Sequence, residues 1–284
     1  MAHAAQMQAK APRKIAYLMV DDAPSGDFAA KTRFLLERNV PAVFFCGGKG
    51  ILANEKLLIE AIRKGFVIGN HAYSHDKFSD MPLMDCLKEI AIADKAVRDL
   101  YAKAGAARPA NLFRFPYLDK GGHKGSEEYF NSPFGRMFMN KGSGAPLSAS
   151  NGGIMAYTDP EKKDAIQNFL GTLGYAQPKF NGLAVEWYEK DGLRADRDTI
   201  ATYNTWEYAP GRQGLDAPAH INDEKGVLEH VKAQWAEGKD GTPIIHIPLI
   251  HDRKDAHIDS SELFRKVIDR MLQIGVEFRL PRFA

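Results

Sequence analysis

The stretch Ile15-Ala16-Tyr17-Leu18-Met19-Val20-Asp21-Asp22 consists of six apolar residues followed by two carboxylates. A short continuous apolar run of this kind is typical of a strand that is buried on both faces, as in a parallel sheet. The run ends in ionisable residues, where a buried strand would reach the surface. The same arrangement recurs further along the chain, and it carries the predictions of both fold and site.

Strands and helices are predicted to alternate after this first run. Apolar runs predict further strands at 40–46, 66–69, 112–115, 182–188, 199–206, 242–250 and 276–280. Helical spacing of apolar residues predicts helices at 27–39, 55–64, 82–104, about 160–172, 222–237 and 260–274. Strand followed by helix at this spacing predicts an α/β fold, in which helical crossovers connect parallel strands.

Composition restricts the class of protein. The chain has 284 residues, of which 44% are apolar and 26% charged, and its 38 basic and 36 acidic side chains leave a net charge of +2. This balance gives no electrostatic reason to expect nucleic acid or an anionic membrane as the main partner. No window approaches the roughly 20 apolar residues of a membrane-spanning helix. The two cysteines, Cys46 and Cys86, are expected to be buried thiols.

Two segments fall outside the regular pattern. Residues 1–13 are expected to be a flexible N-terminal segment, with the domain running from 14 to 284. An Ala-x-Ala step in the first segment resembles a signal-peptidase site, and on this basis we expect the protein to be exported. No basic and apolar regions precede the step, so a cytoplasmic location stays open. Residues 118–153 form a Gly-rich insert, which is typical of a lid or binding loop.

Four of the predicted strands end in ionisable residues. They are Asp21-Asp22, His71, Arg114 and His251. Each has an ordinary explanation when taken alone, since Asp often caps a helix and a lone His or Arg is usually structural. Their repeated position changes this, because parallel α/β folds build their sites at the carboxyl ends of strands. The residues are therefore expected to converge on one site, which favours a single domain.

His71 and His75 are four residues apart, a spacing that places both imidazoles on one side of a helical turn. With Asp22 they would form a two-histidine, one-carboxylate set, which is common for catalytic divalent metals. Asp21 would point away from Asp22, because adjacent side chains on a strand diverge. A metal beside a free carboxylate is an arrangement suited to metal-assisted hydrolysis.

The ordered motifs resemble those of the polysaccharide deacetylases, carbohydrate esterase family four. The motifs are Asp21-Asp22, His71-x-x-x-His75, Arg114-Phe115-Pro116-Tyr117 and Leu249-Ile250-His251-Asp252. The resemblance implies a single-domain, distorted (β/α) barrel of about seven parallel strands. It also implies metal-dependent removal of N- or O-acetyl groups from sugars, with an acetylated carbohydrate as the partner.

The resemblance assigns roles to individual residues. Asp22, His71 and His75 would bind one divalent ion, zinc or alternatively Co²⁺, Ni²⁺ or Mn²⁺. Asp21 would be the general base, held by Arg114, and His251 the general acid. The backbone N–H of Tyr117 would help to stabilise the oxyanion.

The sequence departs from the family pattern in two motifs. Ala23 stands where the family usually has Gly, which is tolerable if its φ is negative. The motif that orients the acid histidine is best matched by residues 204–208. Glu207 would then hold His251, with Trp206 and Tyr208 lining the substrate site, and Glu186 is the competing candidate for the orienting carboxylate.

Two other functions remain as alternatives. One is a related C–N hydrolase that acts on a small non-sugar amide, and the other is a non-catalytic carbohydrate-binding protein. The oligomeric state and the identity of the sugar are left open by the sequence.

Overall fold

The computed structural model describes residues 13–121, 160–183, 195–210, 220–236, 242–253 and 260–283. Most of the expected N-terminal segment 1–13 and of the insert 118–153 lies outside this range. The predicted strand at 182–188 and the competing carboxylate Glu186 also lie outside it, apart from residues 182 and 183.

The described strands form two sheets, in which every pairing between strands is parallel. The smaller sheet has the order β6 (Ile244–His246), β1 (Lys14–Ala16), β8 (Val276–Phe278). The larger sheet has the order β4 (Val67–Asn70), β3 (Val43–Cys46), β2 (Met19–Ala23), β7 (Pro248–His251), β5 (Tyr203–Asn204). The predicted α/β class and parallel strands are confirmed. The structure describes eight strands where the resemblance implied about seven, and two predicted strands are each divided between the sheets.

The strands that the structure describes do not close into a continuous barrel. The predicted strand at 112–115 is reduced to a single bridge between Asn70 and Phe113. The carbonyl of Phe113 in turn accepts a hydrogen bond of 2.7 Å from the N–H of Thr199. The segment 112–115 therefore lies between β4 and the segment that leads into β5. It is connected to both by isolated hydrogen bonds and not by a continuous strand pairing.

Alternation along the first strands explains why the opening run is apolar throughout. Ile15, Tyr17 and Met19 belong to one buried cluster. Leu18 and Val20 belong to another, which also contains side chains from α1, α3, α4 and α10. Because successive side chains of a strand point to opposite faces, both faces of the sheet are covered and both demand apolar residues.

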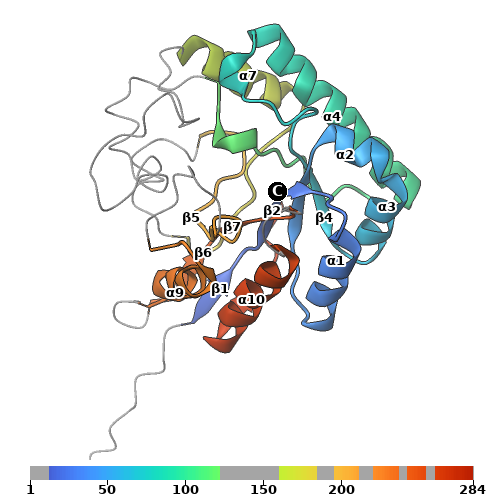
Figure 1. Cartoon of the computed structure of the whole chain (residues 1–284). Coiled ribbons are helices and arrows are strands. Elements are labelled where there is room, and N and C mark those ends of the chain that lie inside the picture. Colours follow the sequence, from blue (N-terminus) through green and yellow to red (C-terminus); the bar gives the residue numbers. More distant parts are fainter. Residues whose placement is uncertain are drawn as a thin grey trace, which may run out of the picture.

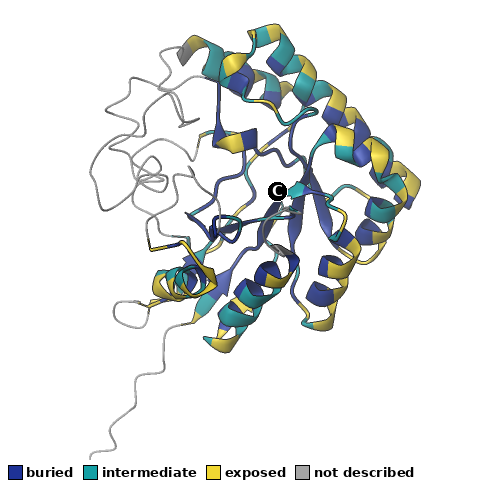
Figure 2. Ribbon diagram, viewed as in Figure 1, coloured by how far each residue is buried: buried dark blue, intermediate teal, exposed yellow. Residues whose placement is uncertain are grey.

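Helices surround the strands on the outside, as Figure 1 shows. They are α1 (Phe28–Glu37), α2 (Gly48–Ala53), α3 (Glu55–Arg63), α4 (Leu83–Ala104), α7 (Pro160–Thr172), α9 (Glu224–Gln234) and α10 (Ser260–Gln273), with short 3-10 turns η1 (Phe78–Asp80) and η2 (Pro116–Leu118). Their exposed residues lie on the outer faces, while the central strands are buried (Figure 2). Among the described residues, no helix combines the length and apolar composition needed to cross a membrane.

Two close approaches position elements around the site. Helix α1 packs beside α10, and the pair Arg38–Asp269 joins them at 2.6 Å between Nε and Oδ1. Helix α2, which the sequence did not predict, begins at Gly48. A Cβ on Gly48 would lie 2.5 Å from the ring of Tyr73, so glycine lets α2 approach the loop that carries the two histidines.

Candidate active site

A β-bulge at the end of β2 separates the two adjacent aspartates. Val20 pairs with Phe44 and Ala23 with Cys46, so β2 has one more residue than β3 between these pairs. Asp22, with a φ of 62°, takes the left-handed conformation there, which is uncommon for a residue other than glycine. Bulges commonly re-aim a side chain beside an active site. The positive φ falls on Asp22, so Ala23 fits without the glycine that the family pattern led us to expect.

The three expected metal ligands come together. Oδ1 of Asp22 lies 2.8 Å from Nε2 of His75 and 3.4 Å from Nε2 of His71. The ligand atoms of the three residues all lie within 4.8 Å of one another. The helical turn that the spacing suggested is wrong, because Ala72 and His75 have φ values of 59° and 67° and fold the segment into an irregular loop.

Side chains that the sequence analysis did not single out hold this loop. Oδ1 of Asn70 accepts a hydrogen bond of 2.8 Å from the N–H of Ala72. Oε2 of Glu89, on α4, accepts the N–H groups of Tyr73 and Ser74 at 2.9 and 2.6 Å. In the sequence Glu89 resembles any polar residue of an amphipathic helix, so no local signal could have identified it.

The chemistry of the three donors fits a divalent metal. Nδ1 of His71 lies 2.9 Å from the carbonyl oxygen of Arg114, which fixes Nδ1 as the protonated nitrogen and leaves the lone pair on Nε2. Burial would raise the pKa of Asp22, but its interactions with the His71 and His75 side chains outweigh burial and hold that pKa well below its usual value. Two imidazole nitrogens and one ionised carboxylate form a donor set of the kind that binds zinc and similar ions.

Asp21 lies behind this cluster and is paired with a buried cation. Nη1 of Arg114 lies 3.0 Å from Oδ1 of Asp21, and both side chains are almost completely buried. The other guanidinium nitrogens donate to the carbonyl oxygens of Thr199 and Ile200. The guanidinium also stacks over the ring of Phe45, at 4.6 Å from its centroid. Arg114 is thus fixed on every side and holds the Asp21 carboxylate in one orientation.

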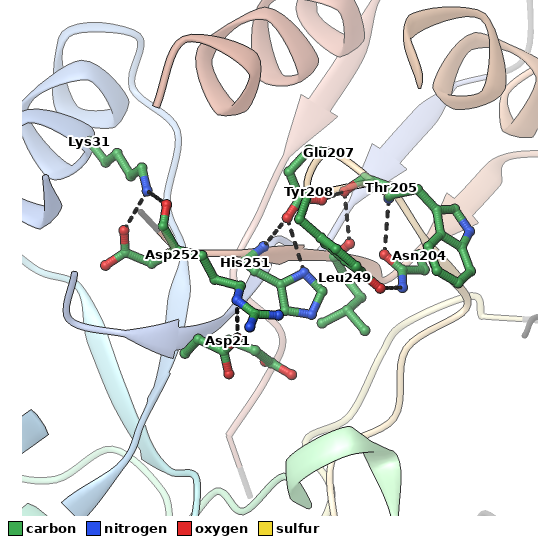
Figure 3. Close-up of polar contacts among 12 residues, drawn as sticks. Asp21, Lys31, Asn204, Thr205, Glu207, Tyr208, Leu249, His251 and Asp252 are labelled. Carbon is green, nitrogen blue, oxygen red and sulfur yellow. Dashed lines mark hydrogen bonds and ion pairs between the residues drawn. The ribbon is translucent and has the colours of Figure 1, made fainter. Parts of the chain in front are cut away.

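His251 lies beside Asp21 on the neighbouring strand, because Asp21 of β2 is in register with His251 of β7. Oε1 of the buried Glu207 lies 3.0 Å from Nδ1 of His251 and accepts its backbone N–H at 2.8 Å (Figure 3). The other oxygen of Glu207 accepts the hydroxyl of Thr205. Burial lowers the pKa of His251, but the adjacent Glu207 carboxylate outweighs it, so the pKa is raised overall.

The three aromatic residues expected at the site differ in exposure. Tyr117 follows Pro116 in η2 with a φ of 56°, is 49% exposed, and places its ring 4.7 Å from that of His75. Tyr208 packs edge-on against His251, with ring centroids 4.7 Å apart. Trp206 is only 4% exposed and belongs to the main core, so its ring is a packing residue and the expectation that it lines the substrate site is not supported.

A pocket of about 460 Å³ borders the metal-ligand cluster. Its lining includes all three candidate ligands together with Ser25, Lys49, Tyr73, Asp252 and Arg253. A substrate group can therefore reach the three ligands from solvent.

Sequence comparison agrees with the residues that the site brings together. A model of the family described as polysaccharide deacetylase matches residues 8–126. This match includes the three candidate metal ligands and Arg114, but it ends before Glu207 and His251.

Solved structures described as carbohydrate esterases or deacetylases share the fold of this chain. A family 4 carbohydrate esterase from Streptomyces lividans, in complex with acetate, is 15% identical with a TM-score of 0.51, over 94% of this chain and 92% of that one. A peptidoglycan deacetylase from Bacillus subtilis is 14% identical with a TM-score of 0.51, over 94% and 87%.

A pseudoenzyme of the same family from Bacillus anthracis is 12% identical with a TM-score of 0.52, over 94% of this chain and 63% of that one. At these identities the likeness shows the fold alone. Because the fold is shared by enzymes and a pseudoenzyme, activity must be argued from the residues of the site.

Proposed function

We propose that this protein is a metal-dependent hydrolase that removes acetyl groups from N-acetylated or O-acetylated sugars of a polysaccharide or oligosaccharide. The observation that carries the proposal is the cluster of Asp22, His71 and His75 at the end of β2 and after β4. A base candidate, Asp21, and an acid candidate, His251, are paired in register on adjacent strands beside it. Metal ligands, base and acid are the groups that metal-assisted acyl hydrolysis requires.

Asp22 and the Nε2 atoms of His71 and His75 would hold the divalent ion, zinc being the first candidate. When bound, the ion would polarise the acetyl carbonyl and lower the pKa of a water molecule. Asp21 would accept the proton of the attacking water. Arg114 would keep the carboxylate of Asp21 aimed at that water. Its guanidinium donates to Asp21, and two backbone carbonyls hold the guanidinium in place.

His251 would donate a proton to the sugar nitrogen or oxygen as the bond to the acetyl carbon breaks. This role requires a protonated imidazole, and the Glu207 carboxylate favours that form by raising the pKa of His251. The Nδ1 of His251 is engaged with Glu207, so the proton would be delivered from Nε2. The N–H of Tyr117 would donate to the developing oxyanion, and Tyr208 would limit the movement of the His251 ring.

An exported location accompanies this proposal, because acetylated polysaccharides such as peptidoglycan lie outside the cytoplasm. Fractionation of cells that express the protein from its natural gene would test this, and recovery only in the cytoplasmic fraction would refute export.

The test of function is acetate release from N-acetylated chito-oligosaccharides, peptidoglycan fragments and acetylxylan, with metal analysis of the same preparation. We expect release that stops after chelation and returns on addition of Zn²⁺. Full activity after exhaustive chelation would refute metal dependence. Sugar binding without turnover would instead identify a pseudoenzyme, and turnover only in a parallel panel of small non-sugar amides would identify a different C–N hydrolase.

A further inference from the structure

A buried ion pair next to the site joins helix α1 to the end of β7, the strand that carries the candidate acid. Nζ of Lys31, on α1, lies 2.6 Å from Oδ1 of Asp252, which directly follows β7. Both side chains are fully buried. The proposed mechanism gives neither residue a role, although two charges removed from water at this place are costly unless they are well paired.

The carboxylate of Asp252 also holds the loop that follows the bulge. Its Oδ2 accepts the N–H of Ser25 at 2.7 Å, and its Oδ1 accepts the Ser25 hydroxyl at 2.6 Å. The backbone N–H of Asp252 donates to the carbonyl of Asp21 at 2.7 Å. Asp252 therefore holds the end of β2 at two residues that flank Asp22, namely Asp21 and Ser25 (Figure 3 shows Asp252 beside Lys31 and Asp21).

Asp22, between these two contacts, has a backbone conformation that needs support. Asp22 has a φ of 62°, and such a conformation in a residue other than glycine costs free energy and persists only where its surroundings fix it. Two anchored neighbours leave the backbone of Asp22 little freedom. Asp252 also follows His251 directly in the chain. It therefore links the backbone around the ligand Asp22 to that of the acid candidate His251.

The three carboxylates Asp21, Asp22 and Asp252 differ in their cationic partners. Asp21 is paired with the buried Arg114 and Asp252 with the buried Lys31. Asp22 contacts the two histidines and Arg253, whose side chain is 38% exposed. Of these three carboxylates, Asp22 is therefore the one without a buried lysine or arginine, and it remains available to a metal ion.

We propose that Lys31 and Asp252 form a positioning pair, which acts through Ser25 to hold Asp22 in its ligand geometry and in register with His251. This inference rests on the proposed metal-dependent function, but it concerns ion binding as well as turnover. Lys31 neutralises Asp252 and keeps its carboxylate directed at Ser25 instead of at the ion.

The test compares Lys31→Met and Ser25→Ala with a matched control, Arg38→Met. Arg38 follows α1 and forms an ion pair with Asp269 on α10, so the control also removes a charged link from α1 but one distant from the ligands. For each purified variant we would measure zinc affinity by competition with a chromophoric chelator, kcat and KM for an acetylated sugar, and the thermal midpoint.

We expect Lys31→Met and Ser25→Ala to bind zinc about tenfold more weakly or worse, as is typical when partners of metal ligands are lost. We also expect kcat to fall in both while KM changes little, and Arg38→Met to match the wild type. Folded variants whose zinc affinity and kcat equal those of Arg38→Met would overturn the proposal.

Two further results are decisive as well. If Lys31→Met does not fold, Ser25→Ala decides alone, since it removes only the two hydrogen bonds of the Ser25 hydroxyl, to Asp252 and from the N–H of Asp27, and leaves no charge unpaired. If the wild type binds zinc but hydrolyses no acetylated substrate, the proposed function fails, and the zinc affinities of the variants still confirm or refute the positioning pair.

Discussion

Glu207 contacts His251 twice, since one carboxylate oxygen lies 3.0 Å from Nδ1 of the imidazole and 2.8 Å from the backbone nitrogen of the same residue. The second contact fixes the backbone of β7, and the first fixes both the ring orientation and its charge. A carboxylate placed in this way affects the geometry of the acid candidate and its pKa together.

We therefore predict that Glu207→Gln shifts the pH profile of kcat/KM. The acid must be protonated, so activity is lost as pH rises through the pKa of His251. Glu207 raises that pKa, and its removal should move the basic limb of the profile to lower pH. We also expect a loss of about tenfold or more at pH 8, since acid catalysis typically contributes about 10²–10⁴-fold. A surface control, Glu262→Gln, should keep the wild-type profile, and an unmoved basic limb in Glu207→Gln would refute the coupling.

Removal of any one metal ligand should abolish both ion binding and turnover. In Asp22→Asn, His71→Gln and His75→Gln we expect zinc content, measured by elemental analysis after dialysis, to fall well below one ion per chain. His220→Gln, which alters an exposed histidine, should keep the wild-type content. Stoichiometric zinc in all three ligand variants would place the metal elsewhere.

Arg114 should contribute strongly to stability because it is a buried charge with a buried partner. Arg114→Met would leave Asp21 ionised and unpaired in the interior, so we expect the free energy of unfolding in urea to fall by about 3–5 kcal/mol. Arg38→Met breaks a partly exposed pair and should cost at most about 1 kcal/mol. Equal losses in the two variants would show that burial of the Asp21 pair is energetically unimportant.

The substitution Asp21→Asn tests the role of the base independently of metal binding. Asn keeps the shape of the side chain and a hydrogen bond to Arg114, but it cannot take a proton at the pH of the assay. We expect kcat to fall about 10²–10⁴-fold, the range of general-base catalysis, while the zinc content stays at the wild-type value. Loss of zinc along with activity would instead make Asp21 a ligand.

His246 should make the fold sensitive to acid. Its Nε2 lies 2.9 Å from the carbonyl oxygen of Gln234 and its Nδ1 3.1 Å from the hydroxyl of Thr202. Burial lowers the pKa of His246, and the hydrogen bond to Gln234 only partly opposes this. The unfolded chain binds a proton below about pH 6.5, where the folded chain still excludes it, so this contribution to stability falls as pH drops through that value.

The check is urea unfolding at pH 7.5 and 5.5. His246→Gln should lose less stability than the wild type between these two values, although it starts from a lower stability. His220→Gln should lose as much as the wild type. If His246→Gln and the wild type lose equal amounts, burial of His246 does not contribute to the acid sensitivity.

Much of the fold was predictable from the sequence, because burial on both faces of a strand leaves a continuous apolar run. The strand ends were predictable for the same reason, since Asp21 and His251 interrupt such runs. The bulge was not, because Asp takes a positive φ more often than most residues but still uncommonly, so its residue type alone does not place a bulge at Asp22. Its conformation is imposed by neighbours that are distant in the sequence.

Lys31 shows the same limit more plainly. Within the predicted helix at 27–39 it resembles a solvated lysine, yet its side chain is fully buried. Its partner Asp252 lies near the other end of the chain, and no local pattern relates the two. Long-range ion pairs become visible only once the strands have been placed side by side.

The position of β7 inside the larger sheet has a consequence for the order of events during synthesis. This strand lies between β2 and β5, although it comes from the last part of the chain. A ribosome delivers Asp22, His71 and His75 long before it delivers His251, so the ion-binding residues exist while the proton donor is still untranslated. On the proposed mechanism, a nascent chain cannot act until β7 has entered the sheet between β2 and β5, which postpones hydrolysis until well after the ion-binding residues have been made.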